Sequence, residues 1–210
     1  AADGWQTEYS SMLVNLGFKQ GTACPNAFYH KERGIQCSVH GDDFTSCGPK
    51  PELDWLEQSV AKSYEITLGP RLGPGPDDAK EARALNRIVR WCDGHIEYEA
   101  DPRQAERLIC ECGLDGANAA ATPSVKATFK ELEEDLPLNK ELHTAFRSAS
   151  ARGNYLVADR IDAQYACKEI CRSMSSPSDH SWKALKRLCR YLSGLPRMGY
   201  RYPPSRRSSV

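Results

Sequence analysis

The order of the elements that the sequence predicts indicates an α+β fold, in which an antiparallel sheet backed by helices precedes a mainly helical region. Apolar and polar residues alternate within residues 26–47, and Asp93-Gly94 separates two further strand-like runs. From about residue 101 to 194, apolar residues recur at helical spacing. With 40% hydrophobic and 27% charged residues, the composition of the 210-residue chain is typical of a soluble globular protein.

The first half of the chain predicts two helices around a set of short strands. A helix with Trp5, Tyr9 and Leu16 on one face ends at Gly17, and strands follow at 26–31, 35–39 and 44–47. A second helix begins near Pro51 and presents an apolar stripe of Leu53, Leu56 and Val60. We expect a short edge strand at 64–68 and, at 69–76, an internal boundary rich in Gly and Pro.

The second half predicts one more hairpin and then helices. Its strands are expected at 85–91 and 95–99, and Asp101 is the predicted cap of a helix that ends at Gly113. Residues 117–130 receive no assignment. Three helices are expected at 138–150, 162–174 and 178–194, with the following inward residues: Leu142, Ala145 and Phe146; Tyr165, Ala166 and Ile170; Trp182, Leu185, Leu188 and Leu192.

The first hairpin places two neighbouring acids at its turn, in the stretch His40-Gly41-Asp42-Asp43. Adjacent carboxylates repel each other, and a divalent cation with a preference for oxygen ligands would hold both ionised. A solvated Gly-Asp turn explains the same residues. The hairpin residues alone leave both interpretations open.

Charge and cysteine content give weaker indications. Residues 180–210 contain no acid and carry the basic side chains Lys183, Lys186, Arg187, Arg190, Arg197, Arg201, Arg206 and Arg207. This end would suit a phosphate backbone, and a solvated helix face with a loose tail explains it equally well. Nine cysteines at irregular spacing predict reduced thiols in the cytoplasm or nucleus. Zinc is the weaker interpretation of Cys37 with His40, Cys110 with Cys112, and Cys167 with Cys171, because paired Cys-x-x-Cys motifs are absent from the sequence. No apolar run has membrane-spanning length, so no membrane partner is expected.

Several separated motifs, in the right order, resemble the reverse transcriptase of copia-type LTR retrotransposons. They are residues 5–18, Asn26-Ala27-Phe28, Val39 to Phe44 with Gly48, Ala121-Thr122-Pro123, residues 154–162, and residues 180–194. The resemblance implies an RNA-directed DNA polymerase fragment of a Pol polyprotein, with a partial right-hand palm at 1–100, a helical thumb and connection region at 101–200, and a basic tail at 201–210.

The resemblance also implies a catalytic site and its partners. Asp42 and Asp43 would be the catalytic residues and ligands of two Mg²⁺ ions, with Asp42 bridging both and Asp43 in an outer role. His40 and Gly41 would lie beside the primer, Trp91 and Tyr98 in a primer-grip-like hairpin, and Lys183, Lys186, Arg187 and Arg190 along the nucleic acid. The expected partners are a primed RNA or DNA template and a deoxynucleoside triphosphate.

Departures from the family pattern limit what the fragment is expected to do. His40-Gly41 replaces the usual Tyr-Val, and Arg160-Ile161-Asp162 replaces Arg-Pro-Asp. The family's third catalytic Asp and fingers precede the part that corresponds to Trp5, and its RNase H domain follows the part near Tyr202. We therefore expect the fragment to be inactive alone. The alternative function is a non-enzymatic or degenerate nucleic-acid-binding domain.

Overall fold

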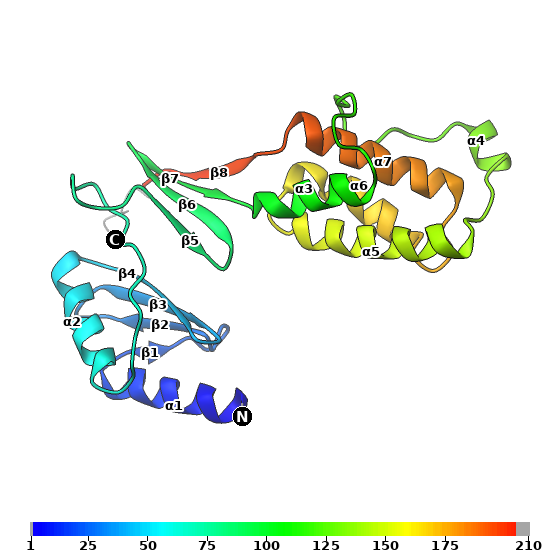
Figure 1. Cartoon of the computed structure of the whole chain (residues 1–210). Helices are drawn as coiled ribbons and strands as arrows, with labels where there is room; N and C mark the ends of the chain where they lie inside the picture. The colour runs from blue at the N-terminus through cyan, green and yellow to red at the C-terminus, as the bar shows by residue number, and fades with distance from the viewer. Residues whose placement is uncertain (1, 205–210) are drawn as a thin grey trace, which may run out of the picture. The chain divides into compact units, whose positions relative to one another are not determined.

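The computed structural model describes residues 2–204, with side chains from residue 4 onward (Figure 1). Arg206 and Arg207 of the predicted basic tail lie outside the described residues. The chain forms two compact units, Ala1–Gly69 and Pro70–Val210, which divide within the Gly- and Pro-rich segment. The second hairpin therefore lies in the second unit, so the unit boundary does not coincide with residue 100. No helix in the described range is both long and apolar enough to span a membrane.

The first unit is a four-stranded antiparallel sheet with two helices on one face. Its elements are α1 (Ala2–Asn15), β1 (Lys19–Gln20), β2 (Ala27–His30), β3 (Ile35–His40), β4 (Asp43–Cys47) and α2 (Lys50–Ala61). The strand order is β1-β2-β3-β4. The predicted helices and strands of this unit are confirmed, except that residues 64–68 form no strand.

Strict alternation along β3 separates a buried face from an open face of this sheet. Ile35, Cys37 and Val39 are buried against the helices, where Leu13 and Leu56 belong to the same apolar cluster. The intervening residues of β3 are exposed. Because successive side chains of a strand point to opposite faces, the helix-free face of the sheet is open.

The second unit combines another antiparallel sheet with a helical bundle. Its elements are β5 (Glu81–Ala84), β6 (Arg87–Cys92), β7 (His95–Glu99), α3 (Pro102–Glu111), α4 (Phe129–Glu133), α5 (Lys140–Leu156), α6 (Ile161–Arg172), α7 (Asp179–Gly194) and β8 (Gly199–Tyr202). The strand order is β5-β6-β7-β8. The mixed fold of helices and antiparallel sheets agrees with the predicted class, although the strands form two sheets.

Two strands of the second sheet were not expected. Leu85 and Asn86, which the prediction placed in a strand, form a turn with φ values of 50° and 68° between β5 and β6. At the other end, β8 pairs with β7 through Tyr98↔Tyr200 and Glu97↔Arg201. The predicted tail at 201–210 is thus wrong at its start, since Arg201 and Tyr202 belong to a strand.

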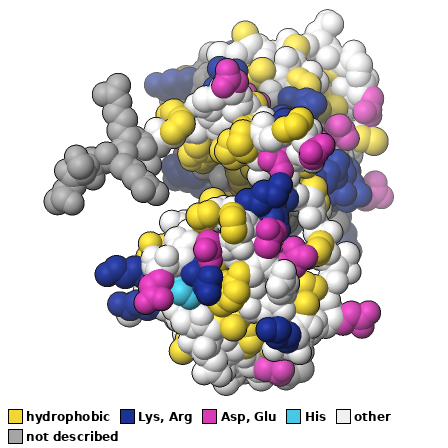
Figure 2. Space-filling view, turned by 90° about the vertical axis from the view of Figure 1, so that its left-hand side faces the viewer, with side chains coloured by type: hydrophobic (Ala, Val, Ile, Leu, Met, Phe, Trp, Pro, Cys, Tyr) yellow, Lys and Arg dark blue, Asp and Glu magenta, His cyan; other side chains and the backbone are white. Residues whose placement is uncertain are grey.

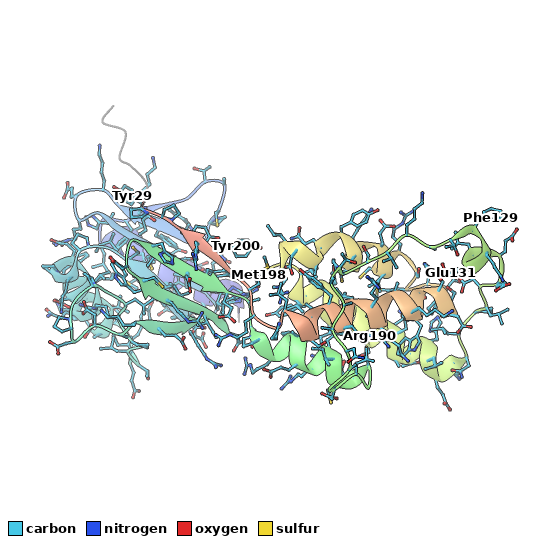
Figure 3. The ribbon with its side chains drawn as sticks, turned by 90° about the horizontal axis from the view of Figure 1, so that it is seen from above. Tyr29, Phe129, Glu131, Arg190, Met198 and Tyr200 are labelled. Atoms are coloured by element: carbon cyan, nitrogen blue, oxygen red, sulfur yellow. The ribbon has the colours of Figure 1, made fainter. Side chains whose placement is uncertain are left out.

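The bundle of α3, α5, α6 and α7 has its own core, centred on Leu108, Phe146 and Leu188. Two residues that were predicted to point into this core do not: Ala145 of α5 is exposed, and Tyr165 of α6 is 69% exposed. A β-carbon on Gly153 would lie 3.2 Å from Cys167 Sγ, so the glycine allows α5 and α6 to approach closely. The short helix α4 lies at the end of the bundle away from the sheet (Figures 1 and 3).

A buried arginine holds the chain between α7 and β8. Arg160 is 2% exposed and donates two hydrogen bonds to the Asp162 carboxylate, at 2.9 and 2.8 Å. Its guanidinium also donates to the carbonyls of Leu195 and Pro196. Ile161, between the two charged partners, is exposed at the first position of α6, a position that also accepts the proline of the family pattern.

Candidate functional site: an acidic hairpin, an aromatic sheet face and a basic helix

The two acids sit at the tightest point of the β3–β4 hairpin. His40 pairs with Asp43, so Gly41 and Asp42 form a two-residue turn. Gly41 has a φ of 59°, which a residue without a β-carbon adopts at little cost. A glycine at the first turn position is typical of the type II′ turns that join twisted antiparallel strands. The local sequence thus fixes where both carboxylates emerge.

The turn presents its polar side chains to solvent and its apolar ones to the core. His40, Asp42 and Asp43 are exposed, whereas Val39 is buried on the opposite face of the hairpin. Trp5 of α1 donates a hydrogen bond from Nε1 to the Gly41 carbonyl at 2.9 Å. The first helix therefore contacts the backbone of the turn directly, a contact that the spacing of Trp5 did not reveal.

The donor set fits a hard divalent cation only in part. Carboxylate oxygens are the ligands that Mg²⁺ prefers, and Asp42 and Asp43 offer them side by side at an accessible position. Among the described residues, however, no third Cys, His, Asp or Glu joins this pair as a cluster with metal-ligand spacing. A metal held here would need water, a substrate phosphate or another segment of protein to complete its coordination.

Trp91 and Tyr98 share one face of the second sheet with two further tyrosines. The register aligns Trp91 with Ile96 and Tyr202, and it aligns Tyr98 with Tyr200. The Trp91 side chain is 37% exposed. Figure 3 shows Tyr200 on this sheet. An aromatic face of this kind would offer stacking surfaces to bases.

The hydroxyl of Tyr98 is committed to a structural contact. It donates to Asp159 Oδ1 at 2.9 Å, and Arg87 donates to the other oxygen of the same carboxylate at 2.8 Å. Burial, together with the hydrogen bond and charge of Asp159, raises the pKa of Tyr98 to about 12. Sequence reasoning missed Asp159, which joins β6 and β7 to the end of α5 across more than 60 residues of chain.

The four predicted basic residues of α7 do not form one uniform face. Lys183 and Arg190 are exposed, whereas Lys186 and Arg187 are half-buried. Arg187 donates to Thr122 Oγ1 at 2.8 Å, so the segment before α4 covers part of this face. Figure 2 views the molecule from the left-hand side of Figure 1 and does not present α7; on the face that it draws, basic and acidic side chains are intermingled.

Acids also face the start of α7. Hydrogen bonds from Thr128 lower the pKa of Glu131, and the charges of His180 and Lys183 lower it further. Asp135 accepts a hydrogen bond from the backbone N–H of His180 at 2.8 Å. The positive charge of Lys183 is therefore partly neutralised by these two acids.

The candidate residues are divided between the two units. Asp42, Asp43, His40 and Gly41 belong to the first unit, and the aromatic and basic candidates belong to the second. Within the second unit, the aromatic candidates lie on the sheet and the basic ones on the bundle. Their roles in metal or nucleic-acid binding stay predictions.

Comparison with known proteins shows similarity to one class, the retrovirus-related Pol polyproteins of transposons. The chain is 39% identical over 207 residues to the Pol polyprotein from transposon RE2 of Arabidopsis thaliana, and 25% identical over 207 residues to that from transposon RE1 of the same plant. Each match covers 95% of this chain and 13% of the relative. The chain is thus related, over nearly its whole length, to a segment of a retrotransposon Pol polyprotein, as the copia-type resemblance predicts.

The chain spans only about 13% of the length of these relatives. No protein-family model matches it. No solved structure matches it at a significant level.

Proposed function

We propose that this chain is the segment of a copia-type reverse transcriptase that carries two of its catalytic carboxylates. The observation that carries the proposal is the position of Asp42 and Asp43, exposed at the tip of a tight antiparallel hairpin. Helices cover only one face of the supporting sheet. The relatives are Pol polyproteins, which is consistent with an origin in a polymerase.

In this proposal the first unit is part of a palm, and the bundle of the second unit is the thumb and connection region. Asp42 and Asp43 would hold the Mg²⁺ ions, with Asp42 as the principal ligand and Asp43 in the outer role. When bound, the ions supply activation of the primer 3′-hydroxyl and neutralise charge on the triphosphate. The chain's own contribution is to hold both carboxylates on a hairpin. Trp5 of α1 supports the turn of this hairpin through its hydrogen bond to the Gly41 carbonyl.

The isolated chain is proposed to be inactive in primer extension. Two adjacent carboxylates leave a pair of Mg²⁺ ions short of protein ligands, and no third candidate ligand lies with them in the described part of the chain. The missing third Asp, fingers and RNase H domain would come from other segments of a longer polyprotein.

The test is a chimera in which this chain replaces the corresponding segment of an active copia-type reverse transcriptase. Mg²⁺-dependent primer extension should persist and be abolished by Asp42→Asn, while Asp43→Asn should reduce it less. Asp77→Asn, which changes an exposed carboxylate in the loop before β5, is the matched control and should have no effect. Equal activity of the Asp42→Asn chimera and its parent would contradict the proposal.

The alternative function, nucleic-acid binding without catalysis, draws support from the exposed basic residues Lys183 and Arg190. It predicts that the isolated chain binds a primer–template duplex with an affinity that falls steeply with salt. Lys183→Gln and Arg190→Gln should each reduce the salt dependence, and Asp42→Asn should leave it unchanged. Absence of binding at low salt would exclude this alternative.

A further inference from the structure

A second cluster of potential metal ligands lies at the tip of the β6–β7 hairpin. Cys92 Sγ, a ring nitrogen of His95 and a carboxylate oxygen of Glu97 all lie within 4.8 Å of one another, and the three side chains are half-buried. It is the one group of three or more such residues with this spacing among the residues that the structure describes. We propose that Cys92, His95 and Glu97 bind a zinc ion.

Strand pairing brings the three side chains together. Cys92 and His95 are directly opposite each other, joined by the two-residue turn Asp93-Gly94, in which Gly94 has a φ of 73°. Glu97 lies two residues beyond His95, so its side chain points to the same face of the sheet. The site is therefore built on two paired strands, which hold ligands more rigidly than a loop does.

The ligand chemistry favours zinc over the hard cations. Thiolate and imidazole are ligands of zinc, and a carboxylate completes sets of three protein ligands that leave one tetrahedral position open. Mg²⁺ and Ca²⁺ prefer oxygen ligands and have little affinity for a thiolate. This site is thus chemically distinct from the Asp42-Asp43 pair, and it does not depend on the proposed polymerase function.

The histidine is already oriented for metal binding. His95 Nδ1 lies 3.1 Å from the backbone carbonyl of Asp93, and Nε2 lies 3.3 Å from Glu97 Oε1. Because a carbonyl oxygen only accepts hydrogen bonds, Nδ1 carries the proton in the neutral ring and Nε2 presents its lone pair to the cluster. A backbone carbonyl that accepts a hydrogen bond from the other ring nitrogen commonly fixes the ring of a metal-binding histidine in this way.

Arg201 competes with a cation for the same carboxylate. Its Nε lies 3.2 Å from Glu97 Oε1, and its side chain is 75% exposed. Exposed ion pairs contribute only about 0–1 kcal/mol, so the arginine can turn into solvent when a metal binds. Arg90, another cation on this face, is held by Glu81 and Glu99. Removing the charge of Arg201 should therefore strengthen metal binding.

Other cysteines of the chain are weaker candidates. Cys167 and Cys171 have sulfur atoms 3.9 Å apart on α6, but they belong to no group of three ligands among the described residues. Burial raises the pKa of the Cys167 thiol to about 12, which disfavours the thiolate. Cys110 is exposed on α3, outside any such cluster in the described range, and its replacement is a matched control for that of Cys92.

The experiment uses the full chain, reduced, and titrates it with Co²⁺ and with Zn²⁺ against a chromophoric chelator. Binding of a single Co²⁺ should give a thiolate charge-transfer band that Zn²⁺ removes. The band should be lost in Cys92→Ser and kept in Cys110→Ser. His95→Gln and Glu97→Gln should weaken Zn²⁺ binding at least about tenfold.

Arg201→Gln gives a readout that misfolding cannot imitate, because it should tighten Zn²⁺ binding relative to the unsubstituted chain. Persistence of the charge-transfer band in Cys92→Ser would overturn the proposal, as would failure of the folded chain to compete with the chelator. Loss of polymerase activity in the chimera has no bearing on these measurements, so failure of either proposal can be recognised separately.

Discussion

At the tip of the first hairpin, the residue before Asp42 is a glycine, Gly41. Gly41 has a φ of 59°, and, apart from its two chain neighbours, no described residue has an atom within 4 Å of the position that a β-carbon would occupy. A β-carbon here would therefore meet no steric obstacle, and its energetic cost would come from backbone strain alone. Glycine at position 41 therefore avoids backbone strain at the turn that presents Asp42.

We predict that Gly41→Ala lowers the free energy of unfolding of the chain by about 1–2 kcal/mol, because L-residues are disfavoured at positive φ. Gly4→Ala is the matched control. It adds the same methyl group to open space within α1, where alanine is the better helix former, and should be neutral or stabilising. Urea-induced unfolding compares the two variants, and a stability loss of equal size in both would contradict the strain argument.

Between elements, one buried carboxylate ties the second sheet to the segment after α7. Glu99 is 3% exposed and accepts two hydrogen bonds from Arg197, at 2.6 and 2.8 Å, and one from Arg90 at 2.6 Å. The hydrogen bond from Arg197 and then that from Arg90 lower the pKa of Glu99, against the opposing effect of burial. The ionised form is thus favoured in the folded state.

The lowered pKa of Glu99 determines the direction in which stability changes with pH. A carboxyl group whose folded pKa lies below its unfolded value stabilises the protein above the unfolded pKa, which is about 4.3 for Glu. That stabilisation is lost as the pH falls through the folded pKa. We therefore predict that Glu99→Gln reduces the loss of stability on acidification below about pH 5.

At neutral pH the same variant should be less stable than the unsubstituted chain by about 1–3 kcal/mol, because two arginines lose a charged partner. Glu81→Gln is the control, since it removes only the exposed partner of Arg90 and should change stability by less than about 1 kcal/mol. Urea unfolding at several pH values measures both effects. Parallel pH curves for Glu99→Gln and the parent chain would show that Glu99 is not the linked group.

Across the whole molecule, the sequence predicts best what is determined locally. The β3–β4 hairpin follows from alternation within a few residues, and α3 from Asp101, which accepts a hydrogen bond from the Arg103 backbone N–H. Strand β8 was missed because its partner β7 lies about 100 residues earlier, and four residues after Met198 carry no pattern of their own. Tyr165 was misplaced because helical spacing identifies residues that share one face of a helix but does not show which of these faces packs against the core.

The candidate sites follow the same rule. The position of Asp42 and Asp43 at a turn was predictable, because the turn and both strands are contiguous in sequence. The cluster of Cys92, His95 and Glu97 was overlooked because its ligands are set by cross-strand register and do not form a linear Cys-x-x-Cys motif. The contact of Tyr98 with Asp159 depends on packing between distant elements, which no local pattern encodes.

The division of the chain leads to a prediction about where it can be cut. Each unit has its own buried cluster, one containing Leu13 and Val39 and the other Leu108 and Phe146. A fragment that begins at residue 70 keeps the complete second sheet and the bundle. We expect this fragment to unfold cooperatively on heating, because no strand pairing or buried ion pair of the unit is interrupted.

A fragment that begins at residue 101, at the predicted palm–thumb boundary, is the matched comparison. It retains the bundle but leaves β8 without β7, Arg197 without Glu99, and Asp159 without Arg87 and Tyr98. We expect it to melt at a clearly lower temperature than the fragment from residue 70, as followed by circular dichroism. Equal melting temperatures would mean that the sheet contributes nothing to the bundle, and residue 100 would then be the physical boundary between the two folding units.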